Sequence, residues 1–277
     1  MTYSADPAFS PARIARVNDK LFAQADEALT GWSDPVARLR AALEKDEFVL
    51  YCQPIRALSG APGFPMAEAL VRLREEESSL LPPGEFLPVF EHYKMMPQLD
   101  RWVLRNVLRR LKLGSKVPRF TINLSVQTLE EATFPAAIAV ELKAAGVAPD
   151  CVLFELDELD VLAKPHDTAR FVSETKKLGC GVMIDGFGRR SVSFAPLKTL
   201  RIDFIKVDGS IIRKILKSET ADNKLKAVVR IAEAIGMGVI AECVEEQDIL
   251  MRVKALRVGY AQGFGIYHPR PIESVAS

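Results

Sequence analysis

Seven polar side chains stand near the ends of otherwise apolar runs, and their types suggest a metal or anion site. Four are acids, one is an amide that often accompanies acids at metal sites, and two could contact an anion. Any one of them alone has an ordinary alternative reading, since a strand-end acid or amide often caps the next helix. The seven are Glu68, Glu155, Asp185, Glu242, Asn123, Lys206 and Gln262.

Gathering the four acids at one buried place as bare anions would be very costly, so cations must offset their charge. Lys206 supplies one positive charge. A hard divalent ion with oxygen ligands, Mg²⁺, Mn²⁺ or Ca²⁺, is the simplest source of the rest. The three histidines, His92, His166 and His268, have no metal-ligand spacing, and the cysteines form no cluster, which argues against zinc.

Short β-rich runs alternate with amphipathic helical patterns from Phe48 onward. Several of the helical patterns end in glycine just before the next strand, as expected of a left-handed helix cap: Gly146, Gly179 and Gly236. Eight strands alternating with helices predict a parallel α/β protein, and a closed (β/α)8 barrel is favoured over a doubly wound open sheet. No glycine-rich phosphate-binding turn follows any strand. The runs are 48–55, 64–73, 119–125, 151–157, 181–187, 203–209, 238–244 and 259–267.

In such a barrel the carboxyl ends of the strands meet at one mouth, which would bring the seven polar side chains together. Residues 1–42 are different in character, with apolar residues at helical spacing between Ile14 and Leu29. We expect an N-terminal helical extension there, which either associates with a partner or packs back, followed by the barrel domain at 43–277.

The composition of the chain argues against two classes of binding partner. The chain has 277 residues, a formal net charge of +1, 48% hydrophobic and 26% charged residues, so neither duplex nucleic acid nor an anionic membrane is an expected partner. It has no bilayer-spanning apolar run and no signal segment, so the cytoplasm is the expected location. Cys52, Cys151, Cys180 and Cys243 form no CxxC pair and are expected to be reduced thiols.

Eight ordered blocks resemble the signature blocks of the EAL domain, a family of cyclic di-GMP phosphodiesterases and their inactive relatives. The blocks run from about Leu43 to Ile272: "AEALVR", "PPGEFLPVFE", "NLS", "FELDE", "IDGFG", "IKVDGS", "IAECVE" and "AQGFGIYHPRP". The resemblance implies a modified TIM barrel with one antiparallel strand, which cleaves one phosphodiester of cyclic di-GMP to give linear pGpG.

The resemblance also implies roles for individual residues. Glu68, Asn123, Glu155 and Asp185 match the ligands of a first metal ion; Asp185 would bridge to a second, with Glu242 among its ligands. Lys206 matches the lysine that orients the attacking water, and Glu158 a glutamate that steadies the loop after the fifth strand. The implied catalytic set is therefore Lys206, Glu68, Glu158 and Glu242. Guanine and phosphate contacts are implied for Gln53, Leu70, Arg72 and Gln262.

One departure from the family bears on activity. Active members carry two consecutive aspartates at the end of the fifth strand, but here Gly186 takes the second place and the following loop reads "GFGRRSVS". Cys243 is a milder change, at a position where the family usually has glycine. We expect one tight site for Mg²⁺ or Mn²⁺, with Ca²⁺ as an inhibitory alternative, and a weakened second site.

Two arginines follow Gly186 in this loop. An arginine here could bring its guanidinium to the phosphate and replace the missing positive charge, so Arg189 and Arg190 join the ligand-binding candidates. Alternatively both are solvated, or they contact a partner subunit, because in the family this loop lies near a dimer contact.

Three functions remain open from the sequence. The favoured hypothesis is a cyclic di-GMP receptor with weak or absent hydrolysis; the alternatives are an active metal-dependent phosphodiesterase and an interaction scaffold that binds no nucleotide. The sequence does not identify a controlling signal, a protein partner or the oligomeric state.

Overall fold

The structure is a computed structural model that describes residues 32, 34–60, 63–74, 80–190 and 193–276. The helical pattern between Ile14 and Leu29 lies outside these residues. The chain divides into two compact units, residues 1–49 with 72–95 and residues 50–71 with 96–277, and each is described by itself. Two of the boundaries between the units lie within the first two strands, after Val49 and after Val71.

The described residues of the smaller unit form two helices. Helix α2, Pro35–Glu44, begins at Asp34, whose carboxylate accepts a hydrogen bond from the Ala37 amide at 2.9 Å, an N-terminal cap. Helix α3 spans Pro83–His92, and the short strand β3, Leu80–Leu81, pairs antiparallel with the end of β2, Met66–Arg74.

The larger unit is a closed barrel. Its strands follow the ring order β1, β9, β8, β7, β6, β5, β4 and β2, and β2 pairs back with β1. β1 runs antiparallel to β9, whereas the neighbouring strands of the ring from β2 and β4 through to β8 and β9 pair in parallel. This confirms the predicted modified TIM barrel with one antiparallel strand and excludes the open sheet. The strands are β1 Phe48–Ala57, β2, β4 Phe120–Leu124, β5 Val152–Asp157, β6 Gly181–Phe187, β7 Phe204–Val207, β8 Gly238–Ala241 and β9 Tyr260–Ala261; β10, Arg270–Pro271, pairs with β1 outside the ring.

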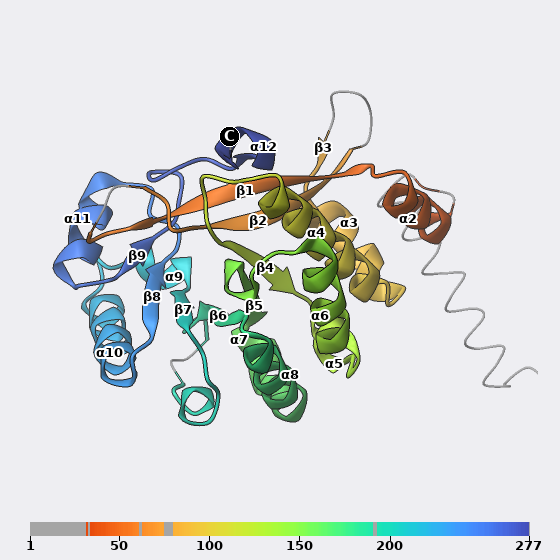
Figure 1. Ribbon diagram of the computed structural model, residues 1–277. Coiled ribbons are helices and arrows are strands. Elements are labelled where there is room, and N and C mark those ends of the chain that lie inside the picture. The colour runs from red at the N-terminus through yellow and green to blue at the C-terminus, as the bar shows by residue number, and fades with distance from the viewer. Residues whose placement is uncertain (1–31, 33, 61–62, 75–79, 191–192, 277) are drawn as a thin grey trace, which may run out of the picture. The chain divides into compact units, whose positions relative to one another are not determined.

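Helices lie around these strands (Figure 1), with α4, α8 and α10 packing against β4, β6 and β8. Helices α6, α8 and α10 end at Gly146, Gly179 and Gly236, each in the left-handed conformation that the sequence predicted. The helices of this unit are α4 Met96–Lys112, α5 Val126–Glu130, α6 Phe134–Ala145, α7 Glu158–Ala163, α8 Pro165–Leu178, α9 Gly209–Ile212, α10 Glu219–Ile235, α11 Gln247–Ala255 and α12 Ile272–Ala276.

A layer of apolar side chains from different strands fills the barrel. The buried members are contributed by five strands, with two aromatic rings packed against them, and we call the set the core layer: Ile55, Met66, Leu153, Met183, Ile240, Phe204 and Tyr260. Because side chains alternate between the two faces of a strand, the residue two positions further along points to the same interior. The core layer therefore determines which residues form the next layer toward the mouth.

Within the described part of the chain, no helix combines the length and the apolar character needed to cross a membrane.

Gly263, two residues after the end of β9, lets this segment pass close to the backbone of Val244. Its φ is +151°, and a Cβ there would lie 2.3 Å from the Val244 amide nitrogen. We expect Gly263→Ala to destabilise the protein by about 3 kcal/mol, because backbone atoms cannot move aside as a flexible side chain does. Thermal unfolding would measure the loss. Gly146→Ala is the matched control: its φ of +67° is also strained but no atom lies within 4 Å, so it should cost only about 1–2 kcal/mol. Equal losses in the two variants would contradict this account.

Candidate functional site at the carboxyl ends of the strands

The predicted site residues form the layer directly above the core layer. Glu68 follows Met66 by two positions, and Glu155 follows Leu153 in the same way. The same spacing relates Asp185, Lys206, Glu242 and Gln262 to the core residues of their own segments. On β1, which runs in the opposite direction, the corresponding residue precedes the core residue: Gln53 comes two positions before Ile55. Strand alternation thus brings residues from seven parts of the chain to one mouth.

Lys206 is the centre of this layer and is almost fully buried, at 1% exposure. Its ammonium lies 3.0 Å from Glu68 Oε2 and 3.7 Å from Asp185 Oδ1, and it also donates a hydrogen bond to Glu155. Three carboxylates thus share one ammonium, which leaves the group with a net negative charge. We call these four residues the lysine cluster.

Amide and hydroxyl groups hold the carboxylates in place. Asn123 Nδ2 donates to Glu68 Oε1 at 2.8 Å, and Gln262 Nε2 donates to Glu68 Oε2 at 2.7 Å. Gln262 also donates to Gln53 Oε1 at 3.2 Å. The Thr121 hydroxyl donates to Glu155. Glu68 is therefore fixed from several sides.

The pKa values reflect this crowding. Burial and the neighbouring carboxylates of Glu68 and Asp185 raise the pKa of Glu155 to about 8, against the opposing effect of Lys206. Burial also raises the pKa of Asp185. Although burial acts in the same direction on Glu68, Lys206 and the amide hydrogen bonds lower its pKa below the usual value. The pKa of Lys206 is raised by the three acids despite its burial. More negative charge is present than one lysine offsets.

One observation fits a divalent ion at this place. Asp185 Oδ1 is buried and accepts no hydrogen bond, so it is an acidic oxygen with coordination capacity to spare. Oxygen donors with excess negative charge are the ligands that Mg²⁺ and Mn²⁺ prefer. In the present side-chain conformations, no three His, Cys, Asp or Glu side chains among the described residues converge on a point that could hold a metal ion. The carboxylates turn toward Lys206 instead, so ion binding would require them to rotate.

A second charged group lies further out, around Arg189. Arg189 Nε donates to Asp208 Oδ2 at 2.9 Å, and its Nη1 donates to Asp157 Oδ2 at 3.1 Å. Asp157 follows Glu155 by two positions and Asp208 follows Lys206 by two, so strand alternation places both acids above the lysine cluster. We call these three residues the arginine cluster.

Backbone amides hold the remaining two acids. Glu158 is buried, and its Oε2 accepts a hydrogen bond from the Gly188 amide at 3.0 Å, which ties it to the loop after β6. Glu242 accepts a hydrogen bond from the Gly209 amide. Burial and the charge of Asp185 raise the pKa of Glu242 to about 7.

The other predicted residues are placed differently. Leu70 is half-buried and follows Glu68 by two positions on β2. Arg72 belongs to the smaller unit, so its contact with a ligand stays a prediction. Arg190 is exposed beside Arg189. Cys243 has a φ of +55°, a left-handed conformation that favours glycine, which accounts for glycine as the usual residue there.

Sequence reasoning missed Thr121, Asp157 and Asp208. The signal was present for the two aspartates, because each stands two positions after a residue that was singled out. A strand-end aspartate usually caps the following helix, and both do so here: Asp157 caps α7 and Asp208 caps α9. Thr121 carried no distinguishing signal.

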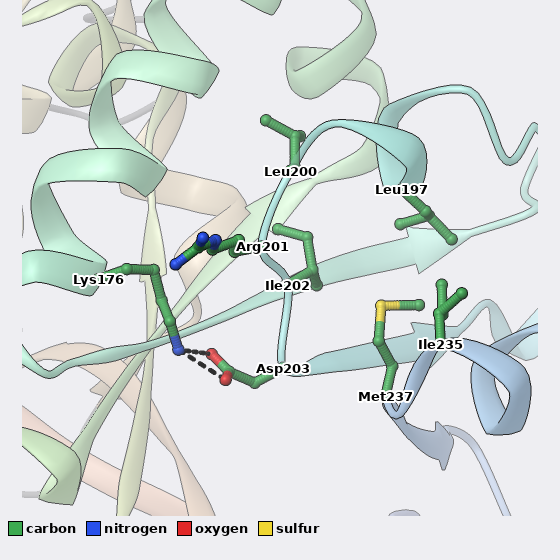
Figure 2. Close-up of a pocket in the computed structure, with 8 residues that line it drawn as sticks. All are labelled: Lys176, Leu197, Leu200, Arg201, Ile202, Asp203, Ile235 and Met237. Atoms are coloured by element: carbon green, nitrogen blue, oxygen red, sulfur yellow. Dashed lines mark hydrogen bonds and ion pairs between the residues drawn. The ribbon is translucent and has the colours of Figure 1, made fainter.

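A separate pocket of about 290 Å³ lies at the amino ends of the strands (Figure 2). It includes Asp203, just before β7, and Met237, just before β8. Lys176 lies 2.6 Å from Asp203 Oδ1, and Asp203 also accepts a hydrogen bond from the Val182 amide at 2.8 Å. This ion pair connects α8 to the sheet, and the pocket contains none of the predicted site residues.

Removing the central cation tests the electrostatics of the lysine cluster. In metal-free buffer at pH 8, Lys206→Met should lower the free energy of unfolding by about 3–5 kcal/mol, because buried carboxylates lose their partner. Acids whose folded pKa is raised take up protons on folding, so stability falls as pH rises through the raised pKa. The loss should therefore be smaller at pH 5, where Glu155 binds a proton. Chemical denaturation at both pH values measures it.

Lys226→Met is the control, since Lys226 is half-exposed and pairs with Asp222 at 2.7 Å on the surface of α10. It should cost at most about 1 kcal/mol at either pH. An equal loss for Lys206→Met at pH 5 and pH 8 would show that packing, and not charge, accounts for its effect.

Comparison with known proteins agrees with this architecture. The EAL domain family matches residues 36–269. The chain is 30% identical over 240 residues to the cyclic di-GMP phosphodiesterase PdeB of Shewanella oneidensis and 32% identical over 238 residues to PdeF of Escherichia coli. These matches cover 86% and 85% of this chain but only 28% and 32% of those proteins.

Two solved structures are similar as well. The FimX EAL domain from Pseudomonas aeruginosa bound to c-di-GMP has a TM-score of 0.80 at 28% identity, covering 85% of this chain and 96% of that one. The PaMucR phosphodiesterase in complex with c-di-GMP has a TM-score of 0.80 at 26% identity, covering 87% and 99%. From the ordered motifs, the closed barrel and these matches, we conclude that the chain belongs to the EAL domain family.

Proposed function

We propose that this barrel is a receptor for cyclic di-GMP that binds one divalent ion and hydrolyses the nucleotide slowly or not at all. The observation that carries the proposal is an intact lysine cluster next to Gly186, where a second carboxylate would be needed to hold a second ion. The proposal is supported by the two similar EAL structures that contain c-di-GMP.

The lysine cluster supplies the part of the site that binds. We propose that Glu68, Asn123, Glu155 and Asp185 hold a Mg²⁺ or Mn²⁺ ion, which when bound offsets the phosphate charge. Binding of the ion would displace a proton from Glu155, because the pKa of this residue is raised to about 8. Lys206 would then keep its charge directed at a water or a phosphate oxygen.

Residues beside the cluster would hold the nucleotide. Gln53 and Gln262 hydrogen-bond to each other at 3.2 Å and present amide groups that suit a guanine edge or a phosphate. Leu70 would pack against a base, and Arg72 would give a phosphate two parallel hydrogen bonds. These four contacts rest on the match to the family's positions.

The main alternative function is active hydrolysis. Lys206 and Glu242 are both retained, and the curated relatives are named as phosphodiesterases. A pure scaffold is less consistent with the structure, because a protein without a ligand has no use for three acids that share one buried lysine.

The setting of the domain is also part of the proposal. We assign the barrel to 43–277, with residues 1–42 as an extension that could meet a protein partner, and we place the homodimer contact, if one forms, at the loop after β6. Free Cys52 and Cys180, both buried, are compatible with a cytoplasmic location. Because the chain spans about a third of the curated relatives it matches, the activity of any longer protein is likewise a proposal.

Binding and turnover can be measured on the same sample. Calorimetry with Mg²⁺ should show cyclic di-GMP binding, while chromatography should show pGpG formation about 10²–10⁴-fold slower than by the PaMucR phosphodiesterase, the loss typical for one missing catalytic contribution. Rapid pGpG formation would refute the receptor function and favour the phosphodiesterase. Absence of binding heat at every metal concentration would favour the scaffold.

Removal of the metal ion tests whether it contributes to nucleotide binding. In EDTA, cyclic di-GMP should bind at least about tenfold more weakly, about 1.4 kcal/mol, because the phosphates would face the uncompensated acids of the lysine cluster. Arg201→Ala, an exposed change at the separate pocket, should respond to EDTA as the wild type does. Equal affinity with and without EDTA would remove the ion from the proposal and leave nucleotide binding in place.

A further inference from the structure

Gly186 leaves a space that the structure fills with a cation from the chain itself. The φ of Gly186 is +65°, and a Cβ built on it would lie 2.5 Å from Arg189 Nη2 and 2.9 Å from Arg189 Cζ. The guanidinium therefore lies directly against the Gly186 backbone, where the side chain of a second acid would begin. The positive φ favours glycine here, and any side chain at this position would require the Arg189 guanidinium to shift.

Each of the four carboxylate oxygens of the arginine cluster already accepts a hydrogen bond. Asp157 Oδ1 accepts from the Leu159 amide and Asp208 Oδ1 from the Ser210 amide, both at 2.8 Å. The second oxygen of each carboxylate accepts from Arg189. The hydrogen bonds to Arg189 lower the pKa of Asp208, although burial acts against them, so it stays ionised.

The loop that carries Arg189 is fixed by its own hydrogen bonds. The Arg189 amide donates to the Gly186 carbonyl at 3.2 Å, and the Gly188 amide donates to Glu158 at 3.0 Å. The side chain is 43% exposed, so its outer surface faces solvent at the mouth while its guanidinium pairs with acids from β5 and from the start of α9. The guanidinium is thus positioned before any ligand arrives.

These residues do not fit a second divalent ion, and we propose that Arg189 is the permanent cation at that place. The inference rests on the proposed function, in that the lysine cluster is taken to bind the first ion. A guanidinium supplies positive charge and hydrogen bonds to a phosphate, but it does not coordinate a water and lower its pKa as a divalent ion does, so it does not generate a nucleophile. The site would accordingly bind the nucleotide's charge without attacking it.

Placing an aspartate at position 186 tests the role of Arg189. Gly186→Asp alone should not create a second ion site, because the new carboxylate would meet the Arg189 guanidinium and pair with it. Only the double change, Gly186→Asp with Arg189→Ala, both adds a ligand and frees Asp157 and Asp208. Two ion sites are therefore expected only when both residues are changed.

Counting bound Mn²⁺ by electron paramagnetic resonance tests this without any turnover. We expect one tight Mn²⁺ per chain in the wild type, in Gly186→Asp and in the control Arg105→Ala, whose arginine pairs with Glu141 on the surface at 2.6 Å. The double variant should bind two. A second ion in Gly186→Asp alone, or in the wild type, would overturn the proposal, as would one ion in a folded double variant.

Separate measurements distinguish failure of the proposed role of Arg189 from failure of the proposed receptor function. Circular dichroism establishes that each variant is folded, and cyclic di-GMP calorimetry on the wild type tests the receptor directly. Wild type that binds the nucleotide and two ions would overturn only the role of Arg189. Wild type that binds neither would overturn the proposed function and this inference with it.

Discussion

The site depends on three carboxylates that share the buried ammonium of Lys206. Glu68, Glu155 and Asp185 come from β2, β5 and β6, and none of these acids could be buried there alone without a large desolvation cost. Burial and, after it, repulsion by the neighbouring carboxylates raise the pKa of Glu155. Folding brings these three carboxylates together, and a divalent ion bound among them would reduce their repulsion.

The barrel makes this arrangement by stacking layers. The core layer of Met66, Leu153, Met183 and their neighbours lies beneath the lysine cluster, and the arginine cluster lies above it. Each layer is displaced from the last by two residues along the strands, so the spacing between layers follows from the pleat of the strands alone. Buried apolar contacts at the bottom thereby position charged groups at the top.

Each of the two charged layers pairs acids with one cation from the chain itself. Three carboxylates share Lys206 in the lysine cluster, and in the arginine cluster each oxygen of Asp157 and Asp208 accepts a hydrogen bond. Gly186 connects the two layers, because it follows Asp185 in β6 and lies against the Arg189 guanidinium. The absence of a carboxylate at position 186 and the position of the arginine are therefore features of the same small region.

The sequence by itself determined the barrel, the helix ends at Gly146, Gly179 and Gly236, and the polar residue near the end of most strands, because periodicity and glycine conformation are local properties. It also showed that Gly186 cannot be a ligand. Only the tertiary structure decided where Arg189 lies. Its guanidinium pairs with two helix-capping aspartates from neighbouring segments while part of the side chain stays exposed, and ion pairs between distant parts of the chain depend on strand register and side-chain direction.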